Sequence, residues 1–429
     1  MEGLLLFIAA LILLLIGFRV AFVFGTVALA FAYLDPDIGL EVFELLPHRI
    51  YGIMQNYTLI ALPLFIFMGL VLEKSGIAEK MLHAIGMLFG KIRGGLAVSV
   101  VVVGAIMAAS MGVVGASVVM MSVISLPIML KNGYAKPLAS GTIAAAGTLG
   151  QLIPPSIVLI ILGDVMQISV GELFQAAIWP SLILVGLYIG YILGQAWLKP
   201  ESAPCVETEM DYKTVVREAV WYILPMAVLI VVVLGSIFAG IATPTESSAI
   251  GALGAVLLTA MNRTMSRELI AYASTETVKI TAMIFMILIG ATAFSLVFNE
   301  AGGGDYVLEL FTEEIGSEWA FIALTMLILF ILGFFIDFIE ITFIIVPILY
   351  PIAYEFGIDP LWFALLIAMN LQTSFLTPPF GFSLFYLKGA AKEMVRTIEI
   401  YKGVIPYIIL QVIALGILLA FPELVSVGE

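Results

Sequence analysis

Two short segments contain residues that would leave backbone oxygen atoms free inside an apolar stretch. The first runs from Gly147 to Ser156 and includes Pro154-Pro155, and the second runs from Thr373 to Gly381 and includes Pro378-Pro379. Consecutive prolines interrupt a helix, because proline lacks a backbone donor and clashes with the preceding turn. The freed carbonyl and hydroxyl oxygens suit a hard cation, and the new helix ends carry partial charges of both signs. We therefore predict ion or solute binding at both segments; a kink without a ligand is the alternative.

Two longer apolar stretches, 95–130 and 320–356, have unusual residues near their midpoints. Small residues from Ser110 to Ser117 surround the first midpoint, near Val113, and would allow close backbone approach. Packing of helices through small residues is the alternative for this segment.

The second midpoint, near Phe338, lies beside Asp337. A carboxylate deep in a membrane is costly and is a functional candidate by default. Glu340 would share a helical face with Asp337 if the helix continues through both residues. An interfacial carboxylate, or one satisfied by packing, is the alternative.

The elements that hold these segments are expected to be membrane helices. Of the 429 residues, 62% are hydrophobic and 11% are charged, whereas soluble domains have about 45–50% apolar and about 25% charged residues. This composition excludes disordered and fibrous proteins, and a net charge of −13 would repel nucleic-acid phosphates. A single cysteine excludes a disulfide framework, and two histidines leave little for a zinc site. We predict an all-α polytopic membrane protein.

Hydrophobic runs of about 20 residues, the length that crosses a bilayer, locate the helices. We expect a retained helix at the N-terminus, because the residues before Leu4 lack the basic start of a signal peptide. The stretches 95–130 and 320–356 are too long for one crossing, so each should form a helical hairpin, either re-entrant or fully crossing. The expected single crossings are 4–17, 20–34, 54–73, 138–166, 172–197, 220–240, 246–262, 278–298, 360–388 and 400–421.

The distribution of charge indicates which side of the membrane each loop faces. With the N-terminus outside, every Lys and Arg except Arg49 lies on or near the cytoplasmic side, as the positive-inside rule requires. The outside segments are acidic, with Asp35, Asp37, Glu41 and Glu44 in one loop and five more carboxylates between 305 and 318. The negative net charge is therefore mainly a property of the outer face.

A repeat of opposite orientation relates the two halves. A shift of 224 residues pairs Pro127 with Pro351, Gly133 with Gly357, and the two Pro-Pro pairs with each other. We predict a first repeat at 1–210, with hairpin 95–130 and broken helix 138–166. The second repeat would be 211–429, with hairpin 320–356 and broken helix 360–388. Inverted repeats with broken helices are typical of transporters whose site lies near the midplane; chance matching of Gly and Pro is the alternative.

Other chemistries have weaker support. Thr243 to Ser248 is typical of a helix start, and we interpret Glu246 as mainly structural. The chain lacks a P-loop, and Gly302 to Asp305, which formally fits an intramembrane protease motif, lies in the outer loop. A channel is disfavoured because broken helices in inverted halves favour alternating access. We expect a transporter that is not an enzyme and has no cofactor.

These segments resemble the large membrane subunit of TRAP (tripartite ATP-independent periplasmic) transporters over nearly the whole chain. The resemblance is carried by Gly133-Tyr134, Gly147 to Ser156, Leu173-Phe174 before Trp179-Pro180, Thr243 to Glu246, and Gly357 to Pro360 leading to Thr377 to Gly381. It implies a sodium-coupled importer of small organic anions, such as dicarboxylates or sialic acid, in the inner membrane of a bacterium or archaeon. It also implies an elevator-like movement, a small four-helix membrane subunit and a periplasmic substrate-binding protein.

The resemblance also implies two sodium sites between hairpin tips and unwound helices. Carried over, the first would use Ser110, Gly112, Ser117, Gly150, Ile153 and Pro155, and the second Gly333, Asp337, Ser374, Thr377 and Pro379. Asp337, Thr148 and Thr373 are the candidate substrate contacts. The open alternative is an ion-coupled dicarboxylate or citrate symporter that needs no binding protein.

Overall fold

Every regular element is helical in the computed structural model, which describes residues 2–111, 114–206 and 212–425. In that part of the chain, six helical segments are long and apolar enough to cross a membrane, and a bent pair, Phe338–Ile344 with Val346–Glu355, would make a seventh. The six are Tyr57–Lys74, Val114–Lys131, Val170–Leu198, Lys213–Phe238, Arg267–Glu300 and Thr397–Ala420. The predicted all-α, multi-span membrane protein is confirmed.

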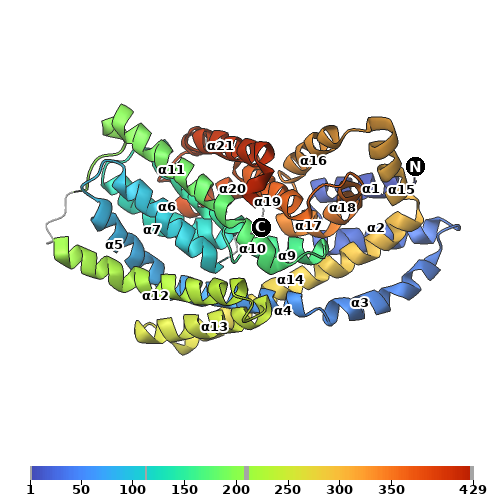
Figure 1. Ribbon diagram of the computed structural model, residues 1–429, viewed down its shortest axis with the longest axis horizontal. Helices are drawn as coiled ribbons and strands as arrows, with labels where there is room; N and C mark the ends of the chain where they lie inside the picture. The colour runs from blue at the N-terminus through green and yellow to red at the C-terminus, as the bar shows by residue number, and fades with distance from the viewer. Residues whose placement is uncertain (1, 112–113, 207–211, 426–429) are drawn as a thin grey trace.

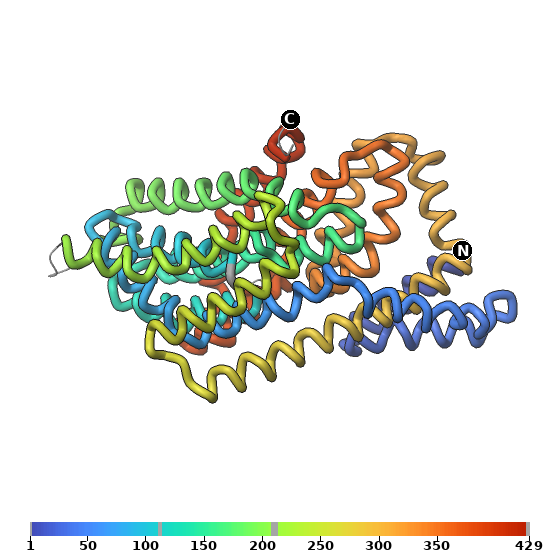
Figure 2. The backbone as a smooth tube through the Cα atoms, turned by 60° about the horizontal axis from the view of Figure 1, so that its bottom comes forward, coloured from blue at the N-terminus to red at the C-terminus, as the bar shows by residue number. Residues whose placement is uncertain are grey.

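One group of helices, here called the frame helices, packs largely with its own members, although α12 packs as extensively on the helix Ile77–Phe89. Helix α14 lies along α2 and crosses α4, α13 lies along α4, and α12 packs on α13. In Figure 2, α14 runs as one long helix along the lower edge of the molecule to the N-terminal helices. The frame helices are α1 (Glu2–Ile16), α2 (Val20–Leu34), α3 (Leu46–Met54), α4 (Tyr57–Lys74), α12 (Tyr212–Phe238), α13 (Pro244–Met261) and α14 (Arg267–Glu300).

The remaining helices contain the predicted hairpins and breaks. They are α5 (Ile77–Phe89), α6 (Gly95–Met111), α7 (Val114–Lys131), α8 (Lys136–Thr148), α9 (Ile157–Val165), α10 (Val170–Ala176), α11 (Ile178–Leu198), α15 (Gly303–Glu309), α16 (Glu318–Leu332), α17 (Phe338–Ile344), α18 (Val346–Glu355), α19 (Pro360–Leu376), α20 (Phe382–Ala391) and α21 (Thr397–Ala420). Short 3₁₀ or π turns are η1 (Leu40–Leu45), η2 (Leu149–Gln151), η3 (Pro200–Ser202), η4 (Leu310–Ile315) and η5 (Pro422–Val425). In Figure 1, α9, α10, α17, α19 and α20 lie between one end formed by α1, α2, α15 and α16 and another formed by α5, α6, α7 and α11. Helices α12 and α14 reach from the ends into the centre.

The centre of the core is formed by α8 and α19. All residues from Leu138 to Thr148 and from Trp362 to Leu376 are buried. A helix that is buried on every side lies in the interior, and α8 and α19 are the helices that run into the two Pro-Pro segments. Helix α12 is the opposite case, because Trp221, Leu224, Val228 and Val231 are exposed and so form a surface suited to lipid.

The predicted hairpins and breaks are present as helices that end where the sequence indicates. Stretch 95–130 is α6 and α7, packed on each other, and stretch 320–356 is α16 followed by α17 and α18, with a bend of 52° between the last two. Stretch 138–166 is α8, η2 and α9, and stretch 360–388 is α19 and the first part of α20.

Several boundaries differ from the predictions. Helix α12 begins at Tyr212, before the predicted span 220–240. Helix α14 begins at Arg267, earlier than the predicted span 278–298, because the charged residues before 278 continue the helix beyond its apolar part. The helix at the second hairpin does not continue through Asp337, because α16 ends at Leu332 and Asp337 is the N-cap of α17. Asp337 and Glu340 therefore do not share one face of a continuous helix.

Local conformation matches at positions that the 224-residue repeat pairs. Gly133 and Gly357 both end helices with positive φ, of 81° and 71°, where glycine is favoured. Gln372 Nε2 lies 3.4 Å from Thr148 Oγ1, and these two residues are 224 positions apart. A residue touches its own counterpart in a two-fold pair only beside the axis, so the predicted repeat would have its axis near Thr148. The predicted boundary between 210 and 211 lies outside the described residues and stays a prediction.

Candidate functional site

The first break lies between α8 and α9 in the buried centre. After Thr148 the chain forms η2 and then turns through Pro154-Pro155, whose peptide bond is cis, before Ser156 caps α9. Some of the carbonyl groups are satisfied by hydroxyls: Ser156 Oγ donates to Gln151 O at 2.6 Å, and Ser181 Oγ donates to Leu152 O at 3.3 Å. Side-chain hydrogen bonds therefore order this polar segment within the core, and it is not a frayed helix end.

The second break, between α19 and α20, has a similar construction. Its Pro378-Pro379 peptide bond is also cis. Ser383 Oγ donates to Phe375 O at 2.8 Å, and Thr377 Oγ1 donates to Thr373 O at 2.7 Å. The tyrosine hydroxyl of Tyr401 donates to Pro379 O at 3.1 Å. As at the first break, hydroxyl groups donate hydrogen bonds to carbonyl oxygens of this segment.

Each hairpin approaches the break in its own half of the chain. A Cβ atom on Gly147 would lie 2.4 Å from Val118 Cγ2, and one on Gly150 would lie 3.6 Å from Ala108 O. In the second half, a Cβ atom on Gly333 would lie 2.1 Å from Ser374 Oγ. These approaches bring Gly150 to the first hairpin, and Gly333 to Ser374, as the resemblance implies.

The other residues of the two predicted sodium sites lie in or near the same segments. Gly112 and the side chain of Ser110 lie outside the described residues, while Ser117 is buried on α7. Ile153 and Pro155 lie in the first break, and Thr377 and Pro379 lie in the second. Among the described ligands, Gly150 lies against the first hairpin and Gly333 lies against Ser374, and the two sodium sites stay predictions.

The carboxylate of Asp337 has a structural partner. Its Oδ1 accepts a hydrogen bond from Phe338 N at 2.7 Å and so caps α17. The cap uses Oδ1 and leaves the second carboxylate oxygen for another partner, so capping and ligand binding are compatible for this side chain. Glu340, in the first turn of α17, is buried, and its Oε2 has no hydrogen-bond partner in the described part of the protein.

The candidate substrate contacts Thr148 and Thr373 are both buried beside the two breaks. Two amides that were not predicted lie in the same elements. Both polar side-chain atoms of Gln151, and Oε1 of Gln372, lack hydrogen-bond partners among the described residues. Each buried polar atom without a partner lowers the stability of the folded protein by about 1–3 kcal/mol. These atoms are also donors and acceptors that a ligand at the centre of the core could use.

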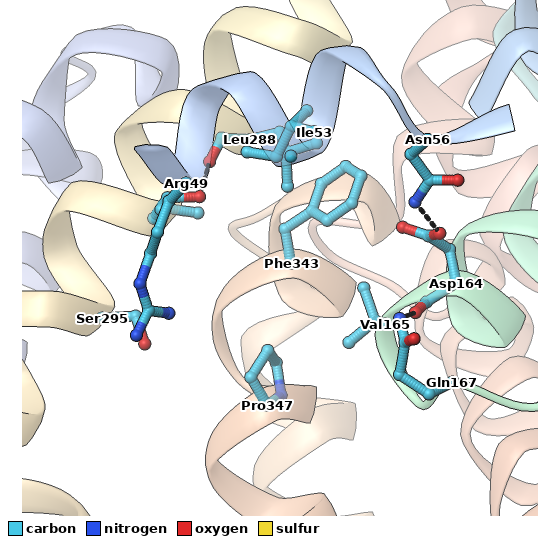
Figure 3. Close-up of a pocket in the computed structure, with 13 residues that line it drawn as sticks. Arg49, Ile53, Asn56, Asp164, Val165, Gln167, Leu288, Ser295, Phe343 and Pro347 are labelled. Carbon is cyan, nitrogen blue, oxygen red and sulfur yellow. Dashed lines mark hydrogen bonds between the residues drawn. The ribbon is translucent and has the colours of Figure 1, made fainter. Parts of the chain in front are cut away.

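A cavity of about 440 Å³ lies between frame helices and the elements that adjoin the breaks (Figure 3). Helices α3 and α14 form one side, and the end of α9 with Phe343 of α17 and Pro347 of α18 forms the other. In the predicted topology these elements meet on the outer side. The polar residues that line this outer cavity are Arg49, Asn56, Asp164, Gln167, Thr292 and Ser295.

One side-chain hydrogen bond joins the frame to the first broken helix at this cavity. Asn56 caps α4 by accepting from Thr58 N, and its Nδ2 donates to Asp164 Oδ1 at the end of α9. Asn56, Asp164 and Gln167 also line a neighbouring cavity of about 410 Å³. The hydrogen-bonded pair Asn56–Asp164 therefore lies between two outer cavities.

The sequence contains a signal for each of two residues at this cavity, Asp164 and Arg49. Asp164 is an acidic residue near the end of a predicted apolar span, which marks a functional candidate. Arg49 is the single basic residue on the predicted outer side. No sequence pattern indicated that the two would line one cavity, because they come from separate elements, α3 and α9.

Glu246, by contrast, has the predicted structural role. Thr243 N donates to Glu246 Oε2 at 2.8 Å, and Thr243 Oγ1 accepts from Glu246 N at 3.3 Å. These reciprocal hydrogen bonds form a capping box at the start of α13.

Comparison with solved structures supports the fold. The crystal structure of the YdaH transporter of Alcanivorax borkumensis matches with a TM-score of 0.65 and 14% identity, covering 99% of this chain and 100% of that chain. At this level of identity the likeness concerns the fold alone.

Comparison with protein families and characterised sequences is more specific. Residues 7–424 match the family described as "Tripartite ATP-independent periplasmic transporter, DctM component". The C4-dicarboxylate TRAP transporter large permease protein of Pseudomonas aeruginosa is 32% identical over 340 residues, covering 79% of this chain and 78% of that protein. The sialic acid TRAP transporter large permease protein of Vibrio cholerae is 27% identical, covering 96% of this chain and 94% of that protein. With its helical fold and its paired broken helices, this chain belongs to the TRAP transporter large permease family, whose members are transport proteins and not enzymes.

Proposed function

We propose that this protein imports a small organic anion across a bacterial inner membrane and couples the import to sodium. The core helices that contain the two breaks would move as an elevator relative to the frame helices, and so expose the solute alternately to each side. A periplasmic binding protein would deliver the anion, and a small four-helix subunit would complete the membrane complex.

One observation carries this proposal: two buried helix breaks, each approached by a hairpin of its own half. At the second break the carbonyl oxygens of Thr373 and Phe375 accept hydrogen bonds from the hydroxyls of Thr377 and Ser383. Gly333 of the second hairpin lies against Ser374. Hard cations prefer such oxygen ligands, and Asp337 would add a carboxylate charge. The residues present therefore fit sodium as a co-transported ion.

The solute class follows from the relatives. Their names assign C4-dicarboxylate, sialic acid, isethionate and ectoine to the respective permeases. Three of these are organic anions, so we assign a small organic anion to this chain. The N-termini of α9 and α20, which begin at the two breaks, would contact it, because helix N-termini attract negative charge. Thr148 and Thr373, at the ends of α8 and α19, would lie beside it.

Reconstitution tests the proposal. Vesicles that contain this chain, its small subunit and the binding protein encoded beside it should take up succinate, N-acetylneuraminate or isethionate when a sodium gradient is imposed. Uptake should stop when potassium replaces sodium. Equal uptake in potassium would refute sodium coupling, and full uptake without the binding protein would favour the alternative symporter.

A further inference from the structure

We infer that the outer cavity contains an anion-binding site in which Arg49 pairs with the carboxylate or sulfonate group of the solute. The inference rests on the proposed function and deepens it, because it names a recognition residue outside the two breaks. It differs from the expectation that helix ends and the binding protein alone select the anion.

The cavity has the size and position of a solute site. Its volume of about 440 Å³ falls within the range of about 300–1,000 Å³ of small-molecule sites. Frame helices α3 and α14 form one wall, and α9, α17 and α18 form the other. A solute held there would contact both groups of helices.

The charge of Arg49 is available to a ligand. The ion pairs of the described residues are Lys136–Glu399, Lys279–Glu276 and Arg396–Glu399, so in this part of the chain no carboxylate lies within ion-pair distance of Arg49. In Figure 3 its side chain extends toward the part of the cavity where Ser295 lies. A guanidinium presents its donors in a planar fork that matches two oxygen atoms of a carboxylate or sulfonate.

Hydroxyl groups accompany the arginine. Thr292 and Ser295 lie one turn apart on α14, and both line the cavity. Thr292 Oγ1 donates to Leu288 O at 2.7 Å, which fixes its position. Ser295 is half-buried, and its hydroxyl is a donor suited to an oxyanion.

The other end of the cavity is acidic and would orient the solute. Asp164 is held there by Asn56, and Gln167 lies beside it (Figure 3). An anionic group is repelled from Asp164 and attracted to Arg49, so it should bind at the arginine end. Because the outer loops are acidic, Arg49 is the local positive charge that would attract an anion from that side.

A lipid phosphate is the other oxyanion that Arg49 would attract. The polar side chains at both ends of the cavity favour a water-soluble solute, because lipid tails need an apolar wall. The experiment below separates the two sources.

The first arm measures sodium-driven uptake of succinate, N-acetylneuraminate and isethionate. Arg49→Gln should raise KM for the transported anion roughly ten- to a hundredfold, because a charge-assisted hydrogen bond contributes about 1.5–3 kcal/mol. Arg49→Lys should recover part of the loss. Arg19→Gln, at an exposed arginine on the predicted cytoplasmic side, is the matched control and should leave KM unchanged.

The second arm detects occupancy without transport. On a Cys205→Ser background, Val165→Cys places a thiol in the cavity wall, and uncharged N-ethylmaleimide labels it. At least one of the three anions should slow labelling when Arg49 is present, and none should slow it after Arg49→Gln. This comparison is made in phosphatidylcholine vesicles with and without phosphatidylglycerol.

The outcomes separate the two hypotheses. Unchanged KM in Arg49→Gln, or no protection by any of the three anions, overturns this inference and leaves sodium-driven transport intact. If the parent imports none of the anions, the proposed function fails, and protection at Val165→Cys still decides whether the cavity binds them. Slower labelling with phosphatidylglycerol alone would assign Arg49 to lipid and overturn the solute site.

Discussion

At the residue scale, Asp337 combines a capping role with a charge that helix capping does not require. The cap accepts one hydrogen bond from Phe338 N through Oδ1. Asparagine caps helices about as well as aspartate, so replacing Asp337 by asparagine removes the charge and keeps the cap. This substitution therefore separates the two roles.

We expect Asp337→Asn to lower the initial rate of sodium-driven uptake about tenfold, the effect of losing one charge-assisted contact to a bound cation. The sodium concentration for half-maximal uptake should rise, and the thermal unfolding temperature should stay the same. Glu313→Gln, at an exposed carboxylate beyond α15, is the control. Equal effects of the two substitutions would show that the charge of Asp337 has no special role.

At the element scale, close helix contacts fix the central helices. Gly141 of α8 and Gly403 of α21 face each other, because a Cβ atom on Gly141 would lie 2.1 Å from Gly403 O. A Cβ atom on Gly403 would lie 2.0 Å from Pro137 O. This contact positions α8, and so the first break, against α21.

Gly403→Ala should therefore destabilise the protein by about 1–3 kcal/mol, because an added methyl in a packed core forces the backbones apart. The measurement is the thermal unfolding temperature of the purified protein in detergent. Gly416→Ala lies on the same helix and meets nothing within 4 Å, so it should be neutral or stabilising by up to about 1 kcal/mol. Similar losses in both variants would contradict the role of the Gly141–Gly403 contact.

At the scale of the whole molecule, the predicted topology places the C-terminal end of α7 and the short turn η4 at opposite faces of the membrane. Lys131 ends α7, and Glu314 lies in η4; both are exposed. On the Cys205→Ser background, a membrane-impermeant maleimide should label Glu314→Cys on intact cells and Lys131→Cys only after permeabilisation. Labelling of both from one side would refute the inverted arrangement.

Much of the fold was predictable because helix breaks and charge are local properties. The Pro-Pro pairs end helices by their own covalent structure, so α8, α9, α19 and α20 begin and end near the predicted residues. The charged start of α14 was missed, because hydropathy identifies the apolar part of a helix and not its extension into water.

The sequence alone determined that this is a helical membrane protein with two interrupted helices, because apolar length, proline and the sign of loop charges act within a few residues. Only the tertiary structure decided which side chains meet: Gly333 with Ser374, Asn56 with Asp164, and Arg49 in a cavity with Ser295. These partners are distant in the chain, and their meeting depends on how α3, α4, α9, α14, α16 and α19 pack. Packing is a property of all the contacting surfaces together, and no single segment of the sequence specifies it.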